Sequence, residues 1–315
     1  MSSSLSNQTM VSFFFIQGIT DIAELQILIF FPVLLIYLVT LGGNMTILLL
    51  ICLDHHLHTP MYFFLANLSV VDLSSSTITL HKVLVISIAG DHLVSYPACI
   101  TQMYIFASLI GHELLILSAM SYDRYIAICN PLRYHTVMNS RVCSLLVTGC
   151  YVMGFIQVLP AVVIFSSFTC YTSNEINHFF CDMIPLMKII CNDTSVLDVL
   201  FLIQGIFVIT LLPFLFTLIS YIFIILVILK IRSKAGKKKA FYTCSSHLTV
   251  VILLYITLVA QYLTPKSFST LNAKKMFSLF NTAAIPMLNP LIYSLKNKDV
   301  KSAMSRRLAL FKVIR

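Results

Sequence analysis

Seven long apolar stretches of the chain contain no Asp, Glu, Lys or Arg, apart from a single acid in each of two of them. They cover residues 25–53, 55–81, 92–122, 142–174, 199–229, 240–265 and 276–295. Each is long enough to cross a bilayer as a helix, which takes roughly 20 residues. The two acids are Asp72 and Glu113. The pattern predicts an all-α membrane protein, a bundle of seven transmembrane helices.

The composition excludes a soluble globular protein. Hydrophobic residues make up 58% of the chain, charged residues 10%, and the mean hydropathy is +0.92. A soluble surface needs far more charge. The net charge of +9 could suggest nucleic acid, but Lys and Arg gather at the borders of apolar stretches. That distribution is typical of cytoplasmic edges, so we expect a lipid bilayer and no nucleic acid as partner.

The distribution of basic residues predicts the orientation. With the N-terminus outside, the inner segments hold 16 Lys and Arg and the outer segments hold 5. The N-terminus lacks the basic start of a secretory signal, so the first membrane helix should direct insertion. We expect an extracellular tail over residues 1–24, the bundle over 25–295, and a cytoplasmic segment over 296–315. This topology is that of a multi-pass plasma membrane protein.

The last segment has its own apolar pattern. Val300, Met304, Leu308 and Phe311 recur at helical spacing with basic residues between them. This predicts a short amphipathic eighth helix that lies on the inner leaflet of the membrane.

Cysteines and glycosylation sequons gather in the predicted outer segments. Cys99, Cys170, Cys181 and Cys191 lie on the oxidising side, where four cysteines permit two disulfides in three pairings. Sequons suited to glycosylation begin at Asn7 and Asn192.

An acid and an arginine stand side by side where the third stretch leaves the membrane. Asp123 can hold Arg124 as an ion pair, and the arginine can instead donate to neighbouring helices or to a partner. Two arrangements of one group are what a switch requires. The simpler alternative is a positive anchor at the membrane interface.

Several short motifs recur in order along the chain. They are Gly43-Asn44, residues 57–62 (L-H-T-P-M-Y), 68–72 (L-S-V-V-D), 120–129 (M-S-Y-D-R-Y-I-A-I-C), Ser220-Tyr221, 239–248 (K-A-F-Y-T-C-S-S-H-L) and 286–294 (P-M-L-N-P-L-I-Y-S). Together they resemble the vertebrate odorant receptors, a branch of the rhodopsin-like G-protein-coupled receptors, from about residue 7 to 311. Residues 178–194 resemble the terrestrial-type class.

The resemblance implies roles for particular residues. It pairs Cys99 with Cys181 and Cys170 with Cys191. It implies that an odorant-bound receptor activates the heterotrimeric stimulatory G protein of olfactory neurons and raises cAMP. The residues expected to switch or to couple are Asp123, Arg124, Tyr125, Tyr221, His247, Asn289, Pro290 and Tyr293.

Two carboxylates deep in a membrane need protonation or a cation. Asp72 and Glu113 with Asn44 and Asn289 would form a polar site, for which the resemblance suggests structural Na⁺. The alternative is a protonated, hydrogen-bonded carboxyl. We expect no other cofactor.

The ligand site is expected in the outer half of the bundle. Its candidate lining residues are Phe106, Ala107, Ile110, Gly111, Gly205, Ile206, Ile209, Tyr255, Val259, Tyr262 and Thr282. Most are apolar, which favours small volatile odorants with one or two polar atoms. Tyr255 and Tyr262, seven residues apart on one helical face, offer hydroxyl groups. Plain core packing is the alternative for each residue.

Other functions fit the sequence less well. His112-Glu113 is not followed by a histidine at the spacing of a zinc protease, so we predict no enzyme. The inverted repeats of transporters are missing. A rhodopsin-like receptor for a lipid-like or other small non-odorant ligand remains the alternative.

Overall fold

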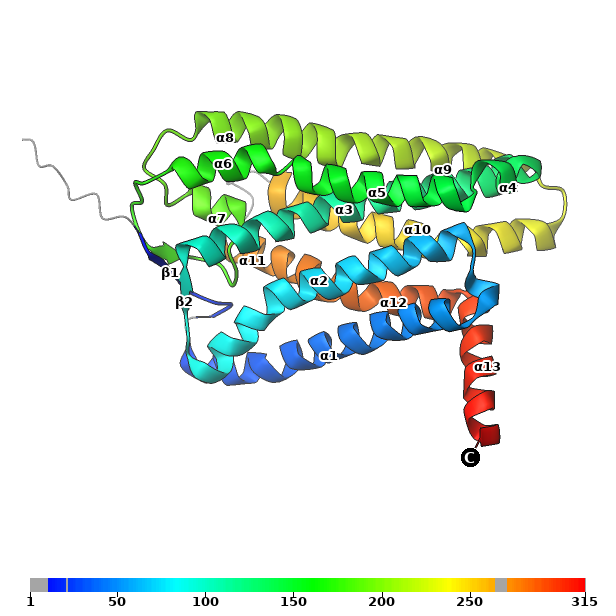
Figure 1. The fold of residues 1–315 in the computed structure, drawn as a ribbon, viewed down its shortest axis with the longest axis horizontal. Coiled ribbons are helices and arrows are strands. Elements are labelled where there is room, and N and C mark those ends of the chain that lie inside the picture. Colours follow the sequence, from blue (N-terminus) through cyan, green and yellow to red (C-terminus); the bar gives the residue numbers. More distant parts are fainter. Residues whose placement is uncertain (1–10, 21, 264–270, 315) are drawn as a thin grey trace, which may run out of the picture.

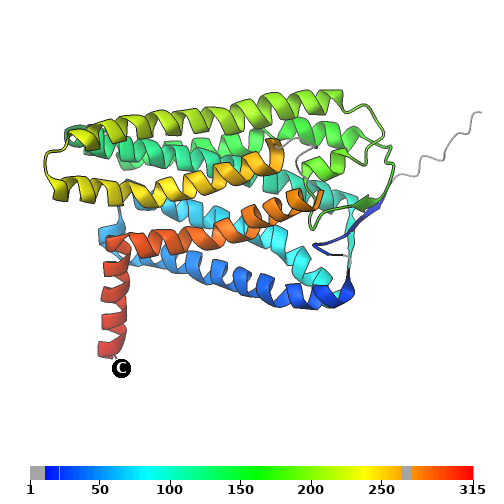
Figure 2. The same cartoon turned by 180° about the vertical axis from the view of Figure 1, so that it is seen from behind.

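The computed structural model describes residues 11–20, 22–263 and 271–314. Its long helices lie side by side in one bundle (Figure 1, Figure 2). In chain order, the seven rods of the bundle are α1 (Ala23–Leu53), α2 (Pro60–Ala89), α3 (Tyr96–Cys129), α5 (Ser140–Ile156) with α6 (Leu159–Ser167), α8 (Ser195–Leu200) with the π-helix η3 (Phe201–Leu211) and α9 (Leu212–Lys230), α10 (Lys234–Leu258) with the π-helix η4 (Val259–Leu263), and α11 (Leu271–Leu279) with the π-helix η5 (Phe280–Ala284) and α12 (Ile285–Lys296). The predicted seven-helix bundle is confirmed.

Short helices complete the connections. They are η1 (His55–Leu57), η2 (Pro131–Arg133), α4 (Tyr134–Val137) and α7 (Met183–Met187). The last helix, α13 (Lys298–Ile314), leaves the bundle at a steep angle (Figure 1). We call the end of the bundle that carries Cys99 the disulfide end, and the end that carries Arg124 the arginine end.

The described helices have the length and polarity of membrane spans. Six of the described helices are long and apolar enough to cross a bilayer, and the seventh rod is more polar, with Asn281 and Asn289 in its middle. On α1, Ile27, Phe31 and Leu35 are each more than 60% exposed. Such an apolar outer surface is costly in water and suits contact with lipid tails.

Helix boundaries differ from the charge-free stretches. The helix α2 begins at Pro60, after extended Thr59, and ends before Gly90, whose φ of +63° is a left-handed cap. The helix α3 continues past Asp123 and Arg124 to Cys129. Charge decides whether a residue tolerates lipid, whereas a helix ends where backbone hydrogen bonding changes. The predicted ends at residues 81 and 122 were therefore too early.

The fourth rod is broken, whereas a single span over residues 142–174 that runs into a loop was predicted. The helix α5 ends at Ile156 and α6 begins at Leu159, with Pro160 in its first turn. Proline lacks the N–H that a continuous helix would need at this position. The break turns Gln157 and Val158 toward the interior cavity described below.

A small sheet at the disulfide end was not predicted. The strand β1 (Phe13–Ile16) lies between β2 (Leu93–Ser95), which is antiparallel to it, and β3 (Glu175–Ile176), which is parallel. Phe14 and Ile16 are fully buried, while Phe13 is exposed, which is the alternation of a half-buried strand. The N-terminal segment is thus part of the cover over this end of the bundle.

Two disulfides anchor the loop between α6 and α8. Cys99 at the start of α3 is bonded to Cys181, and Cys170 is bonded to Cys191. These are the pairings that the family resemblance implied. The first bond attaches the loop to α3, and the second closes the loop on itself.

The predicted amphipathic segment forms α13. Val300 and Ala303 are fully buried against the bundle core, and Met304 packs against the same cluster. The side chains of Leu308 and Phe311 lie outside the described part of the structure.

Candidate ligand cavity and arginine switch

A cavity of about 130 Å³ lies inside the bundle toward the disulfide end. An engineered cavity on the order of 150 Å³ holds a molecule the size of benzene. The walls come from α3, the fourth rod, η3, α10, η4 and the disulfide-bonded loop. The predicted residues that line it are Phe106, Ala107, Ile110, Gly205, Ile206, Ile209, Val259 and Tyr262.

Three predicted lining residues lie elsewhere, and these are corrections to the expected site. Gly111 is covered by the amide of Gln157. Thr282 is buried, donates to the Ser278 carbonyl oxygen at 3.0 Å, and its own carbonyl accepts from Ser76 of α2. Tyr255 packs its ring 4.8 Å from that of Phe214. The π-helix η4 has more residues per turn, so Tyr262 is rotated away from the helical face of Tyr255.

Sequence reasoning missed several polar residues of the cavity wall. Gln157, Asp182, Gln204 and Thr210 all line it. Gln157 and Gln204 are polar residues inside apolar membrane stretches. Such residues often mark a functional site, so their position in the sequence could have identified them. They give an otherwise apolar cavity a few hydrogen-bonding groups.

Asp182 is the one carboxyl group in the described wall of the cavity. Its side chain is 6% exposed and accepts from the Met183 backbone N–H at 2.8 Å. Burial raises the pKa of Asp182 to about 6, and this backbone hydrogen bond offsets part of the rise. The carboxyl also interacts electrostatically with Tyr262. Around neutral pH it is therefore close to its titration range.

The loop that covers the cavity is fixed from several sides. The ring of Phe180 lies 4.7 Å from that of Phe106, a lining residue. The Cys181 N–H donates to Gln102 Oε1 at 2.9 Å. The Gly18 N–H donates to the His178 carbonyl oxygen at 3.0 Å, and Lys275 Nζ donates to the Gly18 carbonyl oxygen at 3.0 Å. The N-terminal segment, the loop and α11 therefore hold one another.

At the arginine end, Arg124 is paired with its neighbour. Arg124 Nε donates to Asp123 Oδ2 at 3.0 Å, and Tyr134 Oη donates to Asp123 Oδ1 at 2.8 Å. Asp123 is fully buried. Tyr125 packs its ring 6.0 Å from Phe223 on α9. The structure thus holds the closed member of the two arrangements expected for Arg124.

A hydrogen-bond chain joins three rods beside this pair. His247 Nε2 lies 3.0 Å from the Leu117 carbonyl oxygen, which can only accept, so this nitrogen carries the proton. His247 Nδ1 then accepts from Tyr221 Oη at 2.6 Å. The chain connects α3, α10 and α9. Separation of α10 from α3 would break it.

The α12 motif meets α1 and α2. A Cβ added at Gly43 would stand 2.8 Å from Pro290 Cγ, so only glycine allows this approach. Asn289 Nδ2 donates to both oxygens of Asp72, at 3.1 and 3.0 Å. The hydroxyl of Tyr293 is buried and has no partner among the described residues.

The four residues of the predicted sodium site are all buried. Asp72 interacts electrostatically with Glu113. Asn44 Nδ2 donates to the carbonyl oxygens of Thr40 and Pro286, each at 3.0 Å. Asn44 Oδ1 and Glu113 Oε1 have no partner within the described chain. These are oxygen ligands of the kind that hard cations prefer.

Of the two predicted glycosylation positions, Asn7 lies outside the described residues. Asn192 is exposed at the disulfide end, and its Oδ1 accepts from the Cys170 N–H at 3.1 Å.

A seven-helix bundle with an internal cavity at one end and a buried acid–arginine pair at the other is the architecture of a rhodopsin-like receptor. The family model "Olfactory receptor" matches residues 33–310. Mouse olfactory receptor 8G50 is 46% identical over 96% of each chain. Human olfactory receptor 5G3 is 45% identical over 98% of each, and human olfactory receptor 8K3 is 48% identical over 95% of this chain and 96% of its own. The chain belongs to the olfactory receptor family of multi-pass plasma membrane receptors. Its relatives are receptors rather than enzymes.

Proposed function

We propose that this receptor binds small, mostly apolar volatile odorants in the cavity at the disulfide end. The observation that carries the proposal is the cavity itself, whose wall is apolar apart from a few amide, hydroxyl and carboxyl groups. Apolar burial supplies the affinity, and few polar groups fix the orientation. A volume of about 130 Å³ favours an odorant over a long-chain lipid.

The disulfide end faces outward and the arginine end faces the cytoplasm. Disulfides form on the oxidising side, and the excess of basic residues lies in segments at the arginine end. An odorant therefore reaches the cavity from outside the cell, and the transducer meets Arg124 from inside.

Coupling between the two ends is a shift of population. Odorant binding favours a state in which α10 moves away from α3, Arg124 leaves Asp123, and the hydrogen-bond chain through His247 opens. The exposed inner surface then accepts a stimulatory G protein, and cAMP rises. The odorant shifts the equilibrium only by its difference in affinity for the two states.

The polar site around Asp72 suits a sodium ion in the quiet state. Asp72 and Glu113 would supply charge, and Asn44 Oδ1 would supply a neutral ligand. No three His, Cys, Asp or Glu side chains converge among the described residues, so carboxylates and amides would share the coordination. A bound cation would offset the cost of two acids within the membrane.

A cAMP reporter in transfected cells tests the proposal. An odorant panel should evoke cAMP in wild-type cells, and Arg124→Ala should abolish the response at equal surface density. Arg141→Ala, which removes an exposed arginine at the start of α5, is the control and should keep it. A response that persists in Arg124→Ala contradicts the switch, and activation by lipids alone contradicts the ligand class.

A further inference from the structure

We propose that the turn between α1 and α2 is a clasp for α13, and that Asp54 and Tyr62 are positioning residues that favour the quiet state of the receptor. The inference rests on the proposed signalling function. It gives a role to the L-H-T-P-M-Y motif at residues 57–62, which neither the cavity nor the arginine switch uses.

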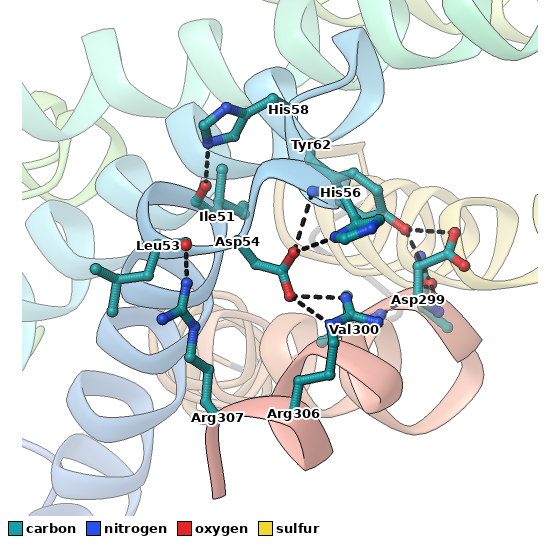
Figure 3. A network of polar contacts seen from close by, with 11 residues as sticks. Ile51, Leu53, Asp54, His56, His58, Tyr62, Asp299, Val300, Arg306 and Arg307 are labelled. Atoms are coloured by element: carbon teal, nitrogen blue, oxygen red, sulfur yellow. Dashed lines mark hydrogen bonds and ion pairs between the residues drawn. The ribbon is translucent and has the colours of Figure 1, made fainter. Parts of the chain in front are cut away.

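The first contact of the clasp is an ion pair (Figure 3). Arg306 Nε and Nη2 both donate to Asp54 Oδ2, at 3.0 and 2.7 Å. Asp54 Oδ1 accepts from the His56 N–H at 3.0 Å, so the same carboxylate caps η1. The Arg306 guanidinium holds the pKa of Asp54 well below its ordinary value. One oxygen of Asp54 therefore caps η1 in the turn, and the other binds Arg306 of α13.

The second contact lies at the hinge between α12 and α13. The hydroxyl of Tyr62 lies 3.1 Å from Asp299 Oδ2 (Figure 3). It also lies 3.0 Å from Asn297 Oδ1, and its one proton is shared between the two acceptors. Asn297 Oδ1 also accepts from the Asp299 N–H at 2.9 Å, which caps the first turn of α13. Tyr62 is 5% exposed, so these bonds are shielded from water.

Further contacts bring α13 and the motif to the end of α1. Arg307 donates to the Leu53 carbonyl oxygen, and His58 Nε2 donates to that of Ile51 at 2.9 Å (Figure 3). These carbonyls end a helix and have no partner within it. Buried Val300 and Ala303 add apolar contact with the bundle. Loss of the polar contacts therefore changes the position of α13 and leaves its apolar attachment.

The clasp is connected to the switch through α12. The Asn297 N–H donates to the Tyr293 carbonyl oxygen at 3.1 Å, so the switch tyrosine stands one turn from the hinge. A shift of this end of α12 carries Asn297 with it and strains the bonds to Tyr62. The structure has the clasp closed together with the Asp123–Arg124 ion pair. Opening the clasp therefore favours release of Arg124.

Distance measurement between two spin labels tests the clasp directly. Labels at Leu132, which is fully exposed in η2, and at Ser305, which is exposed on α13, are placed in a Cys52→Ser background that removes the exposed free thiol. The wild-type distance distribution should be narrow, and Asp54→Asn and Tyr62→Phe should each broaden it. Asp91→Asn, which neutralises an exposed ion pair with Lys82 at the disulfide end, is the control and should leave it unchanged.

The same variants are assayed for ligand-free cAMP at matched surface density. Tyr62→Phe removes a shielded hydrogen bond and should raise the ligand-free signal about fivefold. Asp54→Asn should raise it less, because its partner Arg306 is partly exposed to solvent. Arg306→Ala should raise the ligand-free signal by the same factor as Asp54→Asn, because both variants remove the same ion pair. The double variant should therefore raise it no further. An unchanged distance distribution overturns the clasp. A broadened distribution without a higher signal, in a receptor that responds to odorants, overturns its effect on the switch. If the wild-type receptor never raises cAMP, the proposed function and the effect of the clasp on the switch are both contradicted. The spin-label distances then still show whether α13 is held by the turn between α1 and α2.

Discussion

The side-chain amide of Gln157 lies against the backbone of Gly111, where α3 has no side chain. A methyl group at position 111 would overlap with Gln157 Nε2, and one at Gly154 would stand 2.9 Å from the Ser108 carbonyl oxygen. Small residues let two membrane helices approach closely. Because Gln157 lines the cavity, these two glycines set the position of one cavity wall.

Gly154→Ala should push α5 away from α3 and lower the stability of the receptor, because its Cβ would stand 2.9 Å from the Ser108 carbonyl oxygen and 3.2 Å from the His112 backbone nitrogen. Forcing an extra methyl group into a packed interior costs about 1–3 kcal/mol. Thermal unfolding of the purified receptor measures the loss. Gly149→Ala is the matched control, because a Cβ there meets nothing within 4 Å, and it should unfold no earlier than the wild type. Gly111→Ala should cost less than Gly154→Ala, because the Gln157 amide is the far end of a flexible side chain and can move aside. Equal unfolding temperatures for Gly154→Ala and Gly149→Ala would contradict the packing.

The stability of the receptor should depend on pH through Asp182. Its folded pKa of about 6 lies above the ordinary value of 3.8, so the folded state binds the proton more tightly. The contribution of Asp182 to the free energy of unfolding is therefore greatest below pH 4. It falls by about 3 kcal/mol as the pH rises to about 6. Asp182→Asn keeps an acceptor for the Met183 N–H and should flatten the decline. Melting temperatures between pH 4.5 and 7.5 check this, and parallel curves for both proteins would refute it.

Lys275 should tether the N-terminal strand. Its ammonium group is buried and donates to the Gly18 carbonyl oxygen, two residues after β1 ends. Lys275→Met should speed hydrogen exchange of the Phe13–Ile16 amides, because local opening of β1 becomes easier. Lys301→Met on α13 serves as control and should leave that exchange unchanged. Equal exchange in all three proteins would mean that the strand is held by its sheet partners alone.

The two disulfides should differ in their contribution to stability. The Cys99–Cys181 bond closes a loop of 82 residues and the Cys170–Cys191 bond one of 21. Loop-closure entropy predicts losses of about 4.5 and about 3.3 kcal/mol on their removal. Surface expression and thermal unfolding of the two double-serine variants compare them. A larger loss on removal of the shorter loop would contradict the entropic account.

The sequence predicted the membrane spans, the four cysteines on the oxidising side and the Asp123–Arg124 ion pair, because each of these depends on local chemistry. A membrane span requires a long apolar stretch, and an acid next to an arginine at the membrane border can form an ion pair with it. The strand β1 was missed because four residues form a strand only where β2 and β3 supply partners, and those lie far away in the chain.

The cavity wall was predictable on the faces that follow regular helical spacing, such as Phe106, Ala107 and Ile110. The prediction was wrong for Gly111, which the Gln157 amide covers, and for Thr282, which lies in the π-helix η5 and contacts α2. It was wrong for Tyr255 because the π-helical turn of η4 rotates Tyr262, which lines the cavity, away from the helical face of Tyr255. Gln157 was missed because a break beside Pro160 turns it inward, and no periodicity reports such a break.

The central claim is that occupancy of the cavity drives the release of Arg124. The most direct measurement is the concentration–response curve for odorant-evoked cAMP in wild type and in Ala107→Phe, which fills the cavity from α3, at equal surface density. Loss of the response, or at least a roughly tenfold rise in the half-maximal odorant concentration, is the predicted result. An unchanged curve would contradict the account, because the odorant would then act without entering the cavity.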